Sequence, residues 1–184
     1  MGFTTCDITG LVIIEPQVFE DDRGYFFEAY NEKRFKEAGI ACDFIQDNQS
    51  KSSYGVIRGL HYQLPPYAQS KLVRVLEGSI IDVAVDLRKG SPTFGKQFSI
   101  ELSADNKKQL FIPHGFAHGF SVLSQIAIVL YKCDQYYNKQ SEAGIRFNDE
   151  TLAIDWGIPP SQAVISEKDA ILPAFSDCIN TFTY

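Results

Sequence analysis

The sequence predicts an all-β fold, an antiparallel sandwich or barrel, on three observations. Eight or more short apolar or alternating segments are separated by turn residues at regular spacing. Helix signals are few, and the alternating βα units of a Rossmann or TIM fold are absent. Aromatic residues make up 13% of the 184 residues, which favours β structure or a site that stacks a ring. This length fits a single domain spanning 1–184.

The predicted strands are short and follow one another along the chain. Residues 98–102 (FSIEL) alternate strictly between apolar and polar, as a half-buried strand does. The other strands are expected over 10–15, 25–30, 44–53, the two arms of 56–78, 79–87, 110–112 and 126–131. Asn31 is a predicted N-cap for a short helix over 32–38, and 166–170 is expected to form a helical turn.

Composition limits the partners and the compartment. The formal net charge of -6 argues against nucleic acid or an anionic membrane as the main partner. No apolar run is long enough to span a bilayer and no early signal segment is evident, so we expect a cytoplasmic protein. Four cysteines are scattered without a C-x-x-C pair, so buried thiols are expected rather than disulfides or a zinc site.

The stretch Val56–Gly78 holds the first candidate site residues. His61 and Lys71 fall on the two arms of a predicted strand, turn and strand, where both side chains can face one cavity. The chain has only two further histidines, His114 and His118, both in the run PHGFAHGF. Those two patterns resemble the two halves of a cupin jelly roll, a double-stranded β-helix. We interpret His114 as structural.

The same patterns argue against a bound metal. Metal-binding cupins carry a second histidine two residues after the first, together with a carboxylate. Here that position is Gln63, and no acidic residue lies between it and Lys71. Only His61 and His118 remain as nitrogen ligands, and two histidines beside a lysine make a poor metal site. We therefore expect no metal and no other cofactor.

A neutral imidazole without a metal suits general acid–base catalysis. The carboxylate that orients His61 is left open by the sequence among Asp82, Asp86 and Asp169. Tyr131, at the end of a predicted strand, is a candidate proton donor. The ammonium group of the nearby lysine is suited to stabilise an oxyanion. Such a set fits removal of a proton next to a carbonyl, followed by reprotonation of the enolate.

A series of ordered motifs makes the chain resemble one family from about Gly10 to Asp169. The motifs are DDRGYF at 21–26, QDN at 46–48, RGLHYQ at 58–63, KLVR at 71–74, DVAVD at 82–86, PHGFAHGF at 113–120, YK at 131–132, YY at 136–137 and SEKD at 166–169. The chain closely resembles dTDP-4-dehydrorhamnose 3,5-epimerases. This resemblance implies a substrate, dTDP-4-dehydro-6-deoxy-D-glucose, whose C3 and C5 flank the C4 ketone.

The resemblance also implies roles for individual residues. His61 matches the general base, Asp169 the carboxylate that orients it, and Tyr131 the donor on the opposite ring face. Lys71 matches the residue beside the developing enolate, which completes the catalytic set.

Substrate-binding positions follow from the same resemblance. They are Arg23, Glu28, Gln46, Asp47, Asn48, Arg58, Lys71, His118, Tyr136, Glu142 and Lys168. The cations are expected to meet the pyrophosphate and Tyr136 to stack on thymine. Family members are homodimers, so a homodimer is expected here, with Arg23 and Glu28 acting across its interface.

Three other functions share part of this pattern. A mono-epimerase that inverts only C3 or only C5 would use the same His, Lys and Tyr set. A metal-dependent cupin dioxygenase is disfavoured by Gln63 and would lose activity on chelation. A non-catalytic module that binds a sugar nucleotide would have no need of a base facing an acid.

Overall fold

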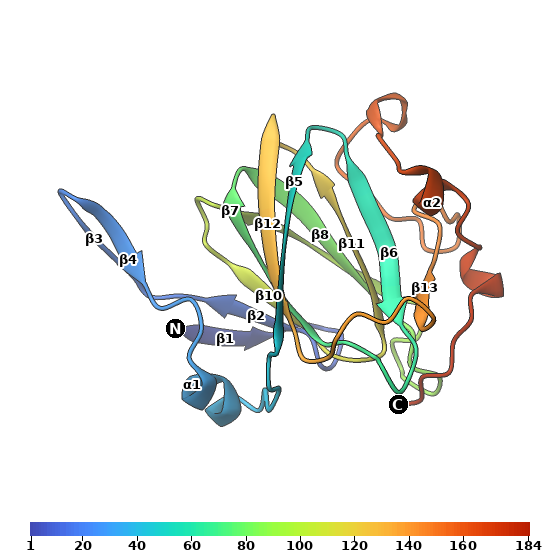
Figure 1. Ribbon diagram of the computed structural model, residues 1–184, viewed down its shortest axis with the longest axis horizontal. Helices are drawn as coiled ribbons and strands as arrows, with labels where there is room; N and C mark the ends of the chain where they lie inside the picture. The colour runs from blue at the N-terminus through green and yellow to red at the C-terminus, as the bar shows by residue number, and fades with distance from the viewer.

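Two antiparallel sheets face each other and enclose the apolar core (Figure 1). The computed structural model describes all residues 1–184. In spatial order, the first sheet contains β1 (Gly2–Thr5), β2 (Val12–Glu15), β10 (Gln109–Ile112), β7 (Lys71–Glu77), β12 (Ile126–Cys133) and β5 (Gln46–Ser53). The second contains β13 (Glu142–Gly144), β6 (Ile57–Gln63), β11 (Phe116–Val122), β8 (Ser79–Asp86) and β9 (Gln97–Ser103). The predicted all-β, cupin-like jelly roll is confirmed.

The core forms because alternate side chains of both sheets point inward. Val73 and Val129 come from the first sheet, Ile80 and Val122 from the second, and all four are at most 1% exposed in one cluster. Because successive side chains of a strand point to opposite faces, each strand presents one set of apolar side chains to the opposite sheet. The predicted alternating strand at 98–102 lies within β9, with Phe98 and Ile100 packed against this cluster.

A long hairpin departs from the sandwich. It consists of β3 (Val18–Asp21) and β4 (Gly24–Phe27), which pair only with each other and project away from the sheets (Figure 1). The turn contains Gly24 at φ +122°, a conformation that favours glycine. The strand predicted over 25–30 is therefore wrong at its C-terminal end, where the chain leaves β4 and enters the capped helix.

Helices are few and short, as the sequence predicts. Asn31 caps α1 (Glu32–Glu37), its side chain accepting a hydrogen bond from the Arg34 N–H, and this predicted N-cap is confirmed. Ser166 caps α2 (Glu167–Ala170) in the same way. The remaining helical turns are the 3-10 segments η1 (Pro160–Gln162) and η2 (Phe175–Asp177). None of the helices has the length and apolar character needed to cross a membrane.

Candidate active site

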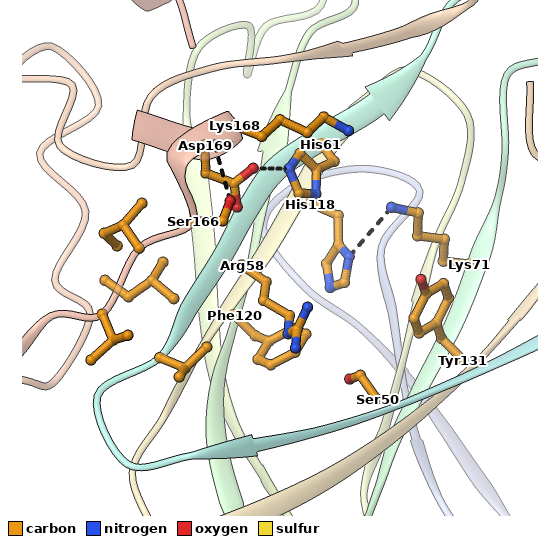
Figure 2. Close-up of a pocket in the computed structure, with 14 residues that line it drawn as sticks. Ser50, Arg58, His61, Lys71, His118, Phe120, Tyr131, Ser166, Lys168 and Asp169 are labelled. Carbon is orange, nitrogen blue, oxygen red and sulfur yellow. Dashed lines mark hydrogen bonds and ion pairs between the residues drawn. The ribbon is translucent and has the colours of Figure 1, made fainter. Parts of the chain in front are cut away.

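A cavity of about 540 Å³ opens between the two sheets. Sheet one supplies Lys71 and Tyr131, and sheet two supplies His61 and His118. The segment before α2 closes one side. Its lining residues are Ser50, Val56, Ile57, Arg58, His61, Lys71, His118, Phe120, Tyr131, Val164, Ile165, Ser166, Lys168 and Asp169 (Figure 2). Titratable groups from opposite sheets therefore line one cavity.

A β-bulge in β6 brings Arg58 and His61 to the same wall. They are three residues apart, so a regular strand would point their side chains to opposite faces. Opposite β11, however, Arg58 pairs with Phe120 and His61 with His118, so β6 contains one residue more than its partner. Gly59 allows this bulge: its φ is +120°, and a Cβ there would lie 2.6 Å from the Gly119 Cα.

His61 is held by Asp169, which lies 108 residues further along the chain. The His61 Nε2 lies 2.6 Å from Asp169 Oδ1 (Figure 2). The other oxygen, Asp169 Oδ2, accepts the Gly59 N–H at 3.2 Å. An ionised carboxylate only accepts hydrogen bonds, so in the neutral tautomer that this contact favours, the ring hydrogen sits on Nε2 and the lone pair on Nδ1. Burial opposes ionisation of Asp169, but the bonds from His61 and Gly59 lower its pKa overall.

A second histidine–carboxylate pair holds the lysine. His118 Nε2 lies 2.7 Å from Asp82 Oδ1, and its Nδ1 lies 3.5 Å from Lys71 Nζ. As the acceptor in this contact, Asp82 places the ring hydrogen on Nε2, which leaves Nδ1 to accept from the Lys71 ammonium. Burial lowers the pKa of His118, which keeps this ring neutral at pH 7, and burial likewise lowers the pKa of Lys71.

Tyr131 faces the histidines from the other sheet. It lies on β12 opposite Val73 of β7, and the Lys71 Nζ sits 5.9 Å from the centre of its ring. Burial raises the pKa of Tyr131 above its usual value, so the phenol stays protonated near neutral pH. A group that can give a proton thus stands across the cavity from an imidazole that can take one.

A smaller cavity of about 150 Å³ shares His61, Lys71 and Tyr131 with the first. Its polar rim includes Gln46 and Asn48 of β5, together with Glu142 of β13 and Tyr137. The Tyr137 hydroxyl donates to Glu142 Oε2 at 2.9 Å, and Lys168 Nζ donates to Glu142 Oε1 at 2.5 Å. The reactive groups therefore stand at the junction of two connected spaces.

Four predicted binding residues lie outside both cavities of their own chain. Asp47 is on the opposite face of β5 from its neighbours and pairs with Lys132 at 2.9 Å, because successive side chains of a strand alternate in direction. Tyr136 is 63% exposed and borders neither space. Arg23, on the projecting hairpin, pairs with Asp21 and is exposed. Glu28 accepts a hydrogen bond from Asn31 and pairs with Arg34.

Several residues that line the cavities are not among those predicted from the sequence. Tyr137 lines the smaller cavity in place of its predicted neighbour, a one-residue difference that no local pattern in YY distinguishes. Ser50 could have been found, because it continues the alternation that Gln46 and Asn48 begin on β5. The place of Phe120 in the lining could not be predicted, because nothing in the sequence distinguishes it from an aromatic residue of the core.

No group of three or more His, Cys, Asp or Glu side chains is placed to share a metal ion. His61 and His118 each donate one ring N–H to their own carboxylate, and His118 turns its other nitrogen to a lysine. His114 lies apart from the cavity and pairs with Asp134 at 2.9 Å.

Fold and site together define a cupin-like jelly-roll enzyme with an imidazole and a phenol on opposite walls of a cation-lined cavity. The chain belongs to the family described as dTDP-4-dehydrorhamnose 3,5-epimerase, whose model matches residues 5–177. The Shigella flexneri enzyme of that name is 52% identical over 170 residues, covering 92% of this chain and 93% of that protein.

Two solved structures share the whole architecture. The dTDP-4-dehydrorhamnose 3,5-epimerase of Elizabethkingia anophelis is 57% identical with a TM-score of 0.93, covering 96% of this chain and 97% of that one. The dTDP-6-deoxy-D-glucose-3,5-epimerase of Legionella pneumophila, solved with dTDP-4-keto-L-rhamnose, is 48% identical with a TM-score of 0.92, covering 96% and 93%.

Proposed function

We propose that this chain, acting as one domain over residues 1–184, inverts C3 and C5 of dTDP-4-dehydro-6-deoxy-D-glucose to give dTDP-4-dehydro-L-rhamnose. The observation that carries the proposal is the imidazole of His61, backed by a carboxylate, facing the protonated phenol of Tyr131 from the opposite sheet. The complex of the Legionella relative with dTDP-4-keto-L-rhamnose supports this choice of product.

The reaction begins with proton removal. The His61 Nδ1 takes the proton from a carbon next to the C4 ketone, and Asp169 stabilises the imidazolium that forms. Electron density moves onto the ketone oxygen, and the Lys71 ammonium stabilises the resulting enolate. Lys71 contacts the neutral ring of His118 and forms no ion pair with a carboxylate, which supports this role because its positive charge is not neutralised.

Inversion follows from the position of the acid. Tyr131 returns a proton to the carbon from the ring face opposite the base, and the enolate electrons re-form the C–H bond with inverted configuration. Solvent exchange then resets base and acid for the second carbon. Both C3 and C5 are activated by the same ketone, so one pair of residues serves both inversions.

The nucleotide is expected to extend over the polar rim. Arg58 and Lys168 supply cations for the pyrophosphate, together with the hydrogen-bonding groups of Gln46, Asn48 and Glu142. We now assign thymine stacking to Tyr137 instead of Tyr136, because Tyr137 lines the cavity and its neighbour does not.

A homodimer completes the proposal. Arg23 and Glu28 lie at the projecting hairpin and just beyond it, outside their own cavity, which suits residues that reach into a partner's site. The four cysteines are all free thiols, which supports a reducing compartment, the cytoplasm.

The direct test is hydrogen exchange. The protein is incubated with dTDP-4-dehydro-6-deoxy-D-glucose in deuterated water, and the proton spectrum of the sugar is followed. Deuterium at both C3 and C5 with formation of the L-rhamno product is the expected result. Deuterium at one carbon would make the protein a mono-epimerase, and deuterium at neither would overturn the proposal.

A residue test uses the two histidines with similar carboxylate contacts. His61→Asn is expected to abolish exchange while dTDP still binds, because the base is lost and the nucleotide rim is intact. His114→Asn is the matched control: His114 pairs with Asp134 at 2.9 Å but lies outside the cavity, so exchange should continue at the wild-type rate. Exchange that survives in His61→Asn would remove this residue as the base.

A further inference from the structure

The side-chain amide of Gln63 holds both peptide groups that flank Tyr137. Its Oε1 accepts the Asn138 N–H at 2.6 Å, and its Nε2 donates to the Tyr136 carbonyl at 3.2 Å. The same Nε2 also donates to the Tyr67 carbonyl at 2.6 Å, which joins a second loop to the first. Gln63 is 4% exposed, so these bonds are shielded from water.

Tyr137 is fixed by further contacts although its ring is open to solvent. The Tyr137 N–H donates to Gln46 Oε1 at 3.2 Å, and its hydroxyl donates to Glu142 Oε2 at 2.9 Å. The residue nevertheless remains 54% exposed. An exposed aromatic ring whose two flanking peptide groups are both hydrogen-bonded is typical of a rigid ligand contact, not of a loop residue that packs a core.

Only an amide can make this set of bonds. The site asks one planar group to accept a hydrogen bond from one N–H and to donate to two carbonyls, which glutamine does with its oxygen and its NH₂ group. A carboxylate would accept from Asn138 but turn its second oxygen toward the carbonyls of Tyr136 and Tyr67. Metal-binding cupins carry a metal-ligating histidine at this strand position. Here the same position holds Gln63, whose hydrogen bonds join two loops.

We propose that Gln63 is a positioning residue for the nucleoside end of the site, acting through Tyr137. This inference rests on the proposed function, in which Tyr137 stacks on thymine. Binding to a ring that is already ordered avoids the loss of backbone freedom that a mobile ring would suffer. Gln63 thus sets nucleotide affinity, while the chemical step remains with His61 and Tyr131.

The test measures dTDP affinity by calorimetry, and kcat and KM by the exchange assay, in Gln63→Leu and Gln63→Glu. Each variant is expected to weaken dTDP binding about tenfold, the equivalent of ordering the backbone of about one residue. KM should rise by a similar factor, while kcat at saturating substrate stays within about twofold of wild type. Asn180→Leu is the control, because Asn180 joins the Leu87 carbonyl to the Phe182 N–H and lines neither cavity.

A double-mutant cycle separates positioning from general loss of structure. In a Tyr137→Ala background the Gln63→Leu change should alter dTDP affinity by less than about twofold, because the ring on which it acts is gone. An equal loss in both backgrounds would overturn the inference, as would unchanged affinity in both single variants. If the wild-type protein neither binds dTDP nor exchanges the sugar protons, the proposed function fails and the inference fails with it.

Discussion

Replacing Asp169 by asparagine removes the charge behind His61 with almost no change in size. The two carboxylate oxygens of Asp169 accept from two donors, the His61 ring and the Gly59 N–H. An asparagine offers one accepting oxygen and one NH₂ group, so one donor would face another donor. The imidazolium formed during proton removal would also lose its counter-charge.

The size of the effect follows from the hydrogen bond that is lost. A hydrogen bond to a charged group contributes about 1.5–3 kcal/mol. If that stabilisation is felt only once the imidazole has taken the proton, the loss appears in the barrier, and each 1.36 kcal/mol is a factor of ten. We therefore expect kcat of Asp169→Asn to fall by about 10- to 150-fold, with dTDP affinity unchanged.

The assay is the initial rate of deuterium incorporation at saturating substrate, with thermal unfolding measured on the same sample. Asp134→Asn is the matched control: Asp134 also contacts a histidine Nε2, that of His114, and its amide can still accept the Ser70 N–H. Exchange within about twofold of wild type in Asp169→Asn would refute the reasoning, because His61 would then need no counter-charge.

Three further outcomes are expected. Tyr131→Phe should still release substrate protons to solvent but form the inverted product slowly, measured as the ratio of exchange to product; wild-type product formation would exclude Tyr131 as the acid. Gly59→Ala should lower the free energy of unfolding by about 1–3 kcal/mol or more in urea titrations, because the added Cβ would meet the backbone of Gly119. Gly90→Ala is the control and should cost less, because Gly90 also has a positive φ, +90°, but has open space around it. Equal losses in the two variants would mean that the bulge is not tightly packed. Asp86→Asn should destabilise the protein at pH 7 by about 1–3 kcal/mol. Burial raises the pKa of Asp86, but its hydrogen bonds outweigh burial and lower the pKa to about 2, so the stability they give is present above pH 3.8 and is lost as the pH falls to about 2. The difference in stability from wild type should close over that range, and a difference independent of pH would contradict the assignment.

Local features of the fold could be predicted because they depend on near neighbours. The alternation over 98–102 selects a half-buried strand whatever it pairs with, and Asn31 caps its helix through a bond only three residues long. His61 and Lys71 were identified for a similar reason: the turn between their strands keeps the two residues in one region of the sheet sandwich.

Long-range packing decided the rest of the site. The residue chemistry alone left Asp82, Asp86 and Asp169 as possible partners for His61. Local sequence patterns do not predict that a residue 108 positions away, Asp169, lies beside the histidine. In the folded chain Asp82 contacts His118, and Asp86 accepts hydrogen bonds from Arg88 and from the hydroxyls of Ser91 and Thr93.

Strand register and loop hydrogen bonds determine which side chains face the cavity. Arg58 shares a wall with His61 only because of a bulge that strand periodicity does not predict. Tyr137, not Tyr136, lines the cavity, and Gln63 hydrogen-bonds to the peptide groups on either side of it. Composition and periodicity determined that this chain forms a sandwich and which residue types it brings to the cavity. Pairing register, loop hydrogen bonds and the approach of distant segments determined which of those residues meet, because these depend on contacts that no sequence window contains.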